Sequence, residues 1–394
     1  MTTRTVILVL LVALLTVGTA TAEQTPFKKV KALDFELTYK GNDSAAVSAA
    51  ASLPYVLIRE GGGVYSLLDL ENLEPHLLAD NAASEKHVSA ADWVGNHVSL
   101  FFTYEGFVER INPESPSQPK DIPAEIQSAP LRHFTWLSDQ EILIDGVRPY
   151  VMREGALTHM GEQNIHIPTQ SGLVVVDEHR YVTSGYEDES LRLYSLPEGD
   201  LLNEWELGGW FSSRKITTIA VVNDRLLVAS AGGRIEERSL EDGEALWSAR
   251  PCRAGPSFFH SSQQQSHNSD FWRTDSINVN DKIFYGCGDR FGTIHRNDEG
   301  WQVEPLHRAL NIEGKLTNVE MVPDTDLAVL VIAQDEVRAV YVVDHQKQAV
   351  LQQLENTQDY NPGPLTYVAA THQLVLVGES DELYLYDLNV AEAE

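Results

Sequence analysis

Histidine and carboxylate side chains gather in two polar stretches of this chain. His260 and His267 are followed by Asp270 in one stretch, and His159 and His166 have the same separation in the other. Imidazole nitrogens with one or two carboxylate oxygens are the usual ligands of Zn²⁺. We therefore expect a zinc site if the fold brings these stretches together.

Two further histidines, His87 and His133, lie where short strands are expected to begin. A surface or structural role for each histidine stays the alternative, because two histidines separated by six residues are not a recognised ligand pattern. Trp272, beside Asp270, could contact a ligand or a partner. The predicted zinc ligands are His87, His133, His166, His260 and His267, and the predicted ligand or partner contacts are Asp270 and Trp272.

The recognised catalytic motifs are missing from the sequence. It contains no GxSxG nucleophile elbow, HExxH metal motif, CxxCH haem site or Walker loop. With 58 acidic residues, the chain offers no means of choosing an acid/base pair. We therefore expect a non-catalytic protein, although a hydrolase or lyase with a site built from scattered residues would leave no such motif.

The N-terminal segment has the pattern of a secretory signal peptide. Arg4 precedes an apolar run from Val6 to Val17, and small residues end at Ala22. We expect export to the periplasm or the medium with cleavage near Ala22, the alternative being an uncleaved anchor. No cysteine follows the apolar run, so a lipid anchor is not expected and the mature protein should have no stable membrane anchor.

Export decides how the two cysteines are interpreted. Cys252 and Cys287 are the only cysteines of the chain, and in an oxidising compartment such a pair most often forms a disulfide. The alternative is a pair of thiolate metal ligands, which oxidation would remove.

The charge balance excludes one class of partner. The chain has 29 Lys and Arg against 58 Asp and Glu, which gives a formal charge of −29. No basic stripe is present to neutralise phosphates, so nucleic acid and anionic membranes are not expected to bind. The acidity is compatible with attraction to cations and equally with adaptation to salty surroundings.

Short strands with turn signals recur along the whole chain, and they predict an all-β fold. The third strand of each repeat starts at one of eight positions, and these are separated by 42, 40, 44, 43, 59, 44 and 46 residues. A period near 43 with about four strands per unit is typical of a β-propeller. The eight starts are Val64, Gly106, Gly146, Ser190, Gly233, Gly292, Glu336 and Glu382.

This count predicts one propeller domain over residues 23–394, after the signal peptide at 1–22, with eight blades and with seven as the alternative. The last repeat lacks a fourth strand, and we expect a strand at Leu33 to Tyr39 to supply it and close the ring. The Trp-Asp pair that ends the third strands of close WD40 repeats is replaced by pairs such as Val343-Asp344, so the repeats are WD40-like but divergent.

The 59-residue step is explained by an insertion at about Arg253 to Arg273, between the fifth and sixth repeats. The segment DSINVNDK after it is the predicted innermost strand of the sixth repeat. A disulfide from Cys252 to Cys287 would hold the base of this insertion.

The stretch from Cys252 to Gly292, with a His-bearing loop and the block FYGCGDRFGTI, resembles the AztD-type periplasmic zinc chaperones. The resemblance implies an exported propeller that passes zinc to the solute-binding protein of a metal importer, with His260 in the loop as a zinc ligand. The His-Gly-Glu of that family's loop is replaced here, where Ser261 and Ser262 follow His260. The alternative is a metal-free scaffold that binds another protein of the cell envelope, and the third reading is the exported hydrolase or lyase.

Overall fold

The computed structural model describes most of the chain. Its described residues are 26–33, 46–50, 52–60, 63–88, 90–94, 96–102, 107–118, 120–123, 133–138, 141–145, 150–153, 156–159, 173–184, 190–196, 198–207, 216–259, 276–279, 282–334, 337–354, 365–377 and 383–389. Within these ranges the structure is almost entirely β, as the sequence predicted.

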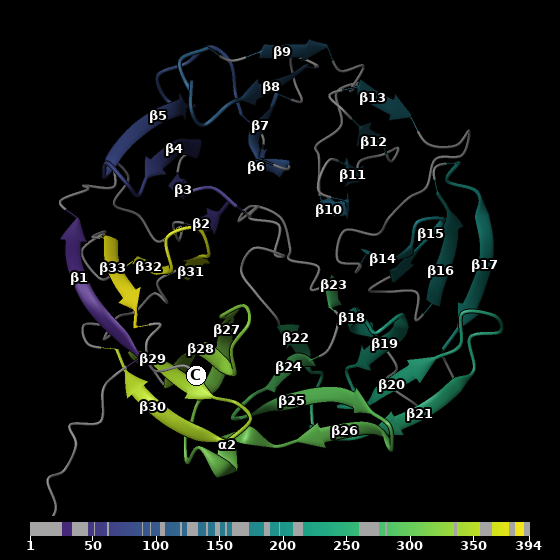
Figure 1. Ribbon diagram of the computed structural model, residues 1–394. Helices are drawn as coiled ribbons and strands as arrows, with labels where there is room; N and C mark the ends of the chain where they lie inside the picture. The colour runs from purple at the N-terminus through teal and green to yellow at the C-terminus, as the bar shows by residue number, and fades with distance from the viewer. Residues whose placement is uncertain are drawn as a thin grey trace, which may run out of the picture.

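The described strands form eight sheets, which we number in chain order from the first complete one and which surround a common axis (Figure 1). Sheet 1 holds β2 (Ala46–Ala49), β3 (Tyr55–Glu60), β4 (Val64–Asp69) and β5 (Glu74–Asp80). Sheet 2 holds β6 (Ala90–Val94), β7 (His97–Phe102), β8 (Phe107–Ile111) and β9 (Lys120–Pro123). Sheet 3 holds β10 (His133–Ser138), β11 (Glu141–Asp145), β12 (Tyr150–Arg153) and β13 (Ala156–His159). Sheet 4 holds β14 (Leu173–Asp177), β15 (Arg180–Ser184), β16 (Ser190–Ser195) and β17 (Leu201–Glu206).

The second half of the chain continues the same order. Sheet 5 holds β18 (Ile216–Val222), β19 (Arg225–Ser230), β20 (Ile235–Arg238) and β21 (Ala245–Ala249), with β23 (Ser276–Val279) as a fifth strand. Sheet 6 holds β22 (Ser257–Phe259), β24 (Lys282–Cys287), β25 (Arg290–Asn297) and β26 (Gly300–Glu304), followed by the short helix α2 (Leu306–Ala309). Sheet 7 holds β27 (Lys315–Met321), β28 (Leu327–Gln334), β29 (Val337–Asp344) and β30 (Ala349–Gln353). Sheet 8 holds β31 (Leu365–Val368), β32 (Gln373–Val377), β33 (Leu383–Leu388) and β1 (Phe27–Leu33).

The predicted third strands are confirmed at all eight positions. Each of them pairs with the outermost strand of its sheet, and they are β4, β8, β12, β16, β20, β25, β29 and β33. Successive strands pair antiparallel, and the fourth strands lie on the outer rim of the ring (Figure 1).

In the sheets whose side-chain burial the structure describes, burial falls from the middle strands to the outer edge. Six successive residues of β24 and of β28 are buried, so both faces of these strands lie in apolar surroundings. β-Branched and aromatic side chains dominate there because they fit the pleated surface between packed sheets. The outermost strands β21 and β30 expose most of their residues instead.

The hydrophobic core consists of clusters that each join two neighbouring sheets. One contains Ala220 and Ile235 of sheet 5 with Phe258 and Ile283 of sheet 6. Another joins side chains of sheet 8 to side chains of sheet 1, so the two ends of the chain share a buried cluster. Because each buried Val, Leu or Phe stabilises by about 1.5–3 kcal/mol, the sheets depend on their neighbours for burial.

The N-terminal strand pairs with the last sheet, at a different position from the one expected. β1 spans Phe27–Leu33 and runs antiparallel to β33, whereas Leu33 to Tyr39 was the predicted strand. Phe27 explains the shift, because its side chain is buried among residues of sheets 7 and 8. Its backbone is also held by Gln352, whose Oε1 accepts from the Phe27 N–H at 2.9 Å and whose Nε2 donates to the Phe27 carbonyl at 2.8 Å.

In the described part of the chain, no helix has the length and apolar character needed to cross a membrane. The predicted signal peptide and its cleavage point at Ala22 lie outside the described residues.

Candidate functional site at the base of the insertion

The first residues of the expected insertion form a strand of sheet 6. The insertion was predicted to begin at about Arg253, between the fifth and sixth repeats, and this boundary was wrong. β22 lies within the stretch predicted to be insertion, and it pairs with β24 from Ser257 opposite Gly286 to Phe259 opposite Phe284. Burial explains this choice. Phe258 packs between sheets 5 and 6 and Phe259 between sheets 6 and 7, so this short strand buries an aromatic ring on each face.

The segment predicted as the innermost strand of the sixth repeat belongs to sheet 5. It forms β23, which pairs in parallel with β18, with Ile219 opposite Ser276 and Val222 opposite Val279. β18 is the first of the four successive strands of sheet 5, and its inner edge would otherwise present backbone N–H and C=O groups without partners. The chain that follows the insertion therefore covers this edge.

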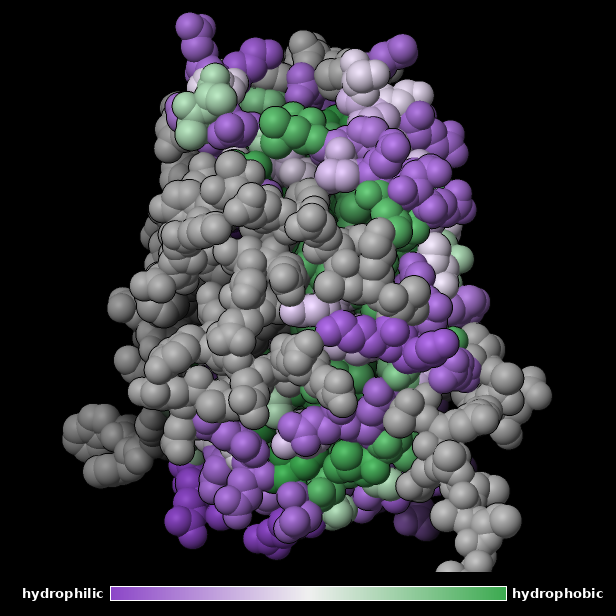
Figure 2. Space-filling model, turned by 90° about the vertical axis from the view of Figure 1, so that its left-hand side faces the viewer, coloured by the Kyte–Doolittle hydropathy of each residue, from purple (hydrophilic) through white to green (hydrophobic). Residues whose placement is uncertain are grey.

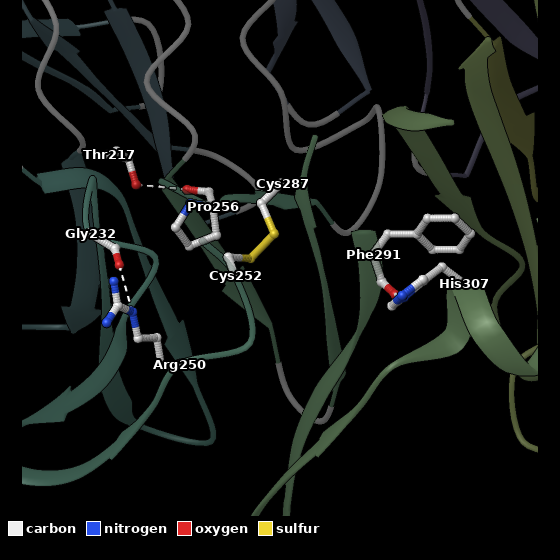
Figure 3. Close-up of a disulfide and its surroundings, with 8 residues drawn as sticks. All are labelled: Thr217, Gly232, Arg250, Cys252, Pro256, Cys287, Phe291 and His307. Atoms are coloured by element: carbon white, nitrogen blue, oxygen red, sulfur yellow. Dashed lines mark hydrogen bonds between the residues drawn. A yellow bond between two sulfur atoms is a disulfide. The ribbon is translucent and has the colours of Figure 1, made fainter. Parts of the chain in front are cut away.

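A disulfide between Cys252 and Cys287 lies at the base of the insertion (Figure 3). The expected disulfide is thus present, and its two Cα atoms are 6.0 Å apart. Both cysteines are buried in the cluster between sheets 5 and 6. Cys252 precedes β22 and Cys287 ends β24, so the bond ties the connection from sheet 5 to the second strand of sheet 6.

Hydrogen bonds from side chains to backbone carbonyls hold the chain on both sides of Cys252 (Figure 3). The Thr217 hydroxyl donates to the Pro256 carbonyl at 2.7 Å, and the Arg250 Nε–H donates to the Gly232 carbonyl at 3.0 Å. Gly233 has φ +81°, and a Cβ there would collide with the Cys252 carbonyl oxygen. Glycine is needed at this position both for its backbone conformation and for the close approach.

Polar side chains also join sheet 6 to its two neighbours. The buried Trp301 indole donates to Glu237 Oε2 of sheet 5 at 2.7 Å, and Arg225 Nη1 lies 3.6 Å from the other oxygen of that carboxylate. On the other side, Lys282 Nζ and His345 Nδ1 are 3.1 Å apart, and both side chains are buried. The first interaction gives a buried carboxylate hydrogen-bonding partners, as such groups require.

Tyr285 stands in the same cluster as the disulfide, and burial raises the pKa of its hydroxyl to about 12. The hydroxyl therefore stays protonated at neutral pH. The surroundings of the disulfide are thus apolar, cross-linked and closely packed, which suits a rigid support for the insertion.

Sequence reasoning missed the polar contacts between sheets. Lys282 is the first residue of an otherwise apolar strand, which is the only local signal that it has a buried partner. His345 has a structural role, because it contacts Lys282 and packs edge-on against the Phe284 ring.

Most of the predicted ligand and contact residues lie outside the described residues, namely His166, His260, His267, Asp270 and Trp272. His87 is exposed in the connection before β6, and His133 is the first residue of β10. Within the described ranges, no three His, Cys, Asp or Glu residues come close enough together to hold a metal ion. The zinc site therefore stays a prediction.

Comparison with solved structures identifies the fold. The C-terminal WD40 domain of Sif2 is 14% identical, with a TM-score of 0.61 over 92% of this chain and 98% of that domain. The chain therefore has a β-propeller fold similar to that of WD40 domains. The computationally designed Ika8 protein also matches this propeller, at 15% identity and a TM-score of 0.57 over 89% of this chain and 99% of that one. No protein-family model and no curated protein sequence matches the propeller.

Proposed function

We propose that this propeller is a non-catalytic scaffold that binds a protein partner through its outer rim. The observation that carries the proposal is the position of the exposed apolar side chains. Among the described residues, every large hydrophobic side chain that is highly exposed lies on an outermost strand, β5, β17, β21 or β30. These side chains are Leu77, Leu201, Leu202, Leu246, Val350 and Leu351.

The outer rim combines these side chains with open backbone edges. Figure 2, which faces the side of the molecule that carries β1, shows hydrophobic surface exposed between hydrophilic side chains. Within β21 and β30 there is no charged residue and no proline, and each strand has a register shift, at Leu246 and at Leu351, that interrupts its regular edge. A partner could therefore gain apolar contact with these exposed side chains at the rim.

The charge of the chain restricts the chemistry of that partner. A formal charge of −29 repels acidic surfaces and favours a neutral or basic contact surface. The envelope partner that the export signal favours would then need a neutral or basic contact surface.

Site-specific photo-crosslinking in the native host tests the rim. A photoreactive residue at Leu351 of β30 should give a discrete cross-linked product, whereas the same residue at Glu299, exposed in the β25–β26 turn, should give none. The cross-linked protein is then purified and titrated against the propeller. The Val350→Ser/Leu351→Ser variant should bind about 30-fold more weakly, because each truncated side chain removes about 1 kcal/mol of apolar burial.

Unchanged affinity of this double variant for the purified partner would refute rim binding. A Glu299→Ser variant is the matched control and should bind like wild type. Circular dichroism and the melting temperature of each variant verify that the fold is retained.

A zinc-binding chaperone function is the second proposal. It is favoured by the disulfide that holds the base of the segment containing His260 and His267, as the AztD-type resemblance implies. Its test is Zn²⁺ competition on the tag-free mature protein after dialysis against chelator. Binding weaker than micromolar, or binding that survives replacement of His87, His133 and His260 together by Ala, would exclude it. N-terminal sequencing of the periplasmic fraction, with Glu23 as the expected first residue, tests export.

A further inference from the structure

The strands β23 and β24 are joined by a connection of hairpin length, although each of them pairs with another strand. β23 ends at Val279 and β24 begins at Lys282, so two residues separate them. The first and second strands of sheets 2 to 5 are joined by the same number of residues, and there the two strands pair antiparallel with each other. In sheet 6 the inner edge of β24 is occupied by β22 instead, and β23 pairs with β18 (Figure 1).

The sequence of this connection repeats the turn of sheet 5. There Asn223 and Asp224 join β18 to β19, with φ 49° and 59°, and Val222 lies opposite Arg225. Positive φ at both central residues is the type I′ conformation that two-residue hairpins favour. Residues 279–282 have the sequence Val-Asn-Asp-Lys, so β23 and β24 are joined by residues that form this hairpin elsewhere in the same chain.

We propose that β22 and β23 exchange on the inner edge of β24. In the second arrangement β23 folds back on β24, with Val279 opposite Lys282 and Ile277 opposite Phe284, while β22 leaves the sheet. The insertion then begins directly after the disulfide, and the inner edge of β18 is uncovered. The exchange therefore sets both the length of the insertion and the backbone edge available inside the ring. It goes beyond the scaffold function and does not depend on it.

Burial favours the arrangement with β22 in place. Phe258 is 0% exposed and Phe259 is 7% exposed, and they pack on opposite faces of β22. In the exchanged register Ser276 would replace Phe258 opposite Tyr285, so one aromatic ring would leave the cluster between sheets 5 and 6. The exchanged arrangement gains a local turn and an antiparallel pairing, which is slightly more stable per residue than the parallel pairing of β23 with β18. These effects oppose each other, so the exchanged arrangement is a minor state.

Fluorine NMR of the whole mature protein, with 4-fluorophenylalanine in place of Phe258, tests the exchange, because this side chain is buried in one arrangement and released in the other. Wild type is expected to give a major buried resonance and a minor one of about 1–10%, which a larger solvent isotope shift identifies as exposed. Asp281→Gly creates Asn-Gly, the preferred type I′ sequence, and should raise the ratio of exposed to buried resonance about fivefold. Asp281→Pro should abolish the minor resonance, because proline cannot adopt a positive φ.

The matched control is Asp224→Gly, which makes the same change in the turn of sheet 5 and should leave the ratio of the two resonances unchanged. The melting temperature of each variant verifies that the propeller is folded. A single resonance at one position in wild type and both Asp281 variants would overturn the proposal. So would equal responses to Asp224→Gly and Asp281→Gly, or a minor resonance that persists in Asp281→Pro.

Discussion

The disulfide between Cys252 and Cys287 closes a loop with a sequence separation of 35 residues, and this loop length determines the expected stabilisation. In the chain-entropy model, a loop of this size lowers the entropy of the unfolded chain by about 13 cal/mol/K, or about 4 kcal/mol at 25 °C. Reducing the bond should therefore lower the free energy of unfolding by about 4 kcal/mol. With about 2.1 cal/mol/K of unfolding entropy per residue over the chain, this corresponds to roughly 5 °C in melting temperature.

Urea unfolding of the protein with and without dithiothreitol measures this loss. Trp301 and Trp247 pack against the cluster that contains the disulfide, so tryptophan fluorescence reports on the cross-linked region. The Cys252→Ala/Cys287→Ala variant is the control, because its stability should not respond to dithiothreitol. Reduced wild type keeps both buried sulfur atoms, whereas the variant lacks them. The variant should therefore be less stable than reduced wild type by about 1 kcal/mol for each sulfur atom removed.

If the free energies of unfolding of oxidised and reduced wild type differ by less than about 1 kcal/mol, this reasoning is refuted. Such a result would mean that the contacts around β22 and β24 already restrict the loop in the unfolded chain, where the cross-link is assumed to act.

Two further substitutions test the contacts between sheets and the turns. Glu237→Ala should lower the free energy of unfolding by about 2–3 kcal/mol in urea titration, because the buried Trp301 N–H loses its acceptor. Glu237→Gln keeps an acceptor and should cost less than half as much, so equal losses would contradict this account. For the carboxyl of Asp344, burial raises the pKa, but hydrogen bonds from the Lys347 side chain and from the Lys347 and Gln346 N–H groups outweigh it and lower the pKa below 3.8. This stabilisation is present above pH 3.8 and is lost as the pH falls through the lowered value, so Asp344→Asn should flatten the dependence of melting temperature on pH between about 5 and 2. An equally steep acid loss in the variant would contradict this role.

The third strands were predictable because each follows a turn signal and contains enough alternating or apolar residues to be recognised alone. The disulfide was predictable because the chain has only two cysteines and its N-terminal segment has the pattern of an export signal. Both inferences need only composition and local periodicity.

The innermost strand of sheet 6 was not predictable in the same way. Ser257 to Phe259 is too short to show a period, while the segment around Ile277 has the length and pattern of the other innermost strands. Whether such a segment pairs with β24 or with β18 depends on which alternative buries more surface in the assembled ring. No local pattern contains that information.

The contact between Lys282 and His345 joins residues 63 positions apart, and Glu237 reaches Trp301 over 64 positions. A lysine or glutamate in a strand is expected to face solvent unless a partner is known, and the partner here comes from another sheet. The predicted histidine site is limited in the same way. Loops that lie on one face of a propeller need not bring their histidine side chains into contact.

The sequence by itself determined an all-β repeat fold, the position of each third strand, the cysteine pair and the expectation that polyanionic partners do not bind. These follow from the period of the repeat and the balance of charge, which are properties of neighbouring residues and of composition. Only the tertiary structure decided that the insertion begins within sheet 6, that β23 covers the inner edge of β18, and that β1 starts at Phe27. Strand edges accept any strand with suitable backbone geometry, so the partner of an edge is selected by long-range burial of side chains such as Phe27, Phe258 and Phe259.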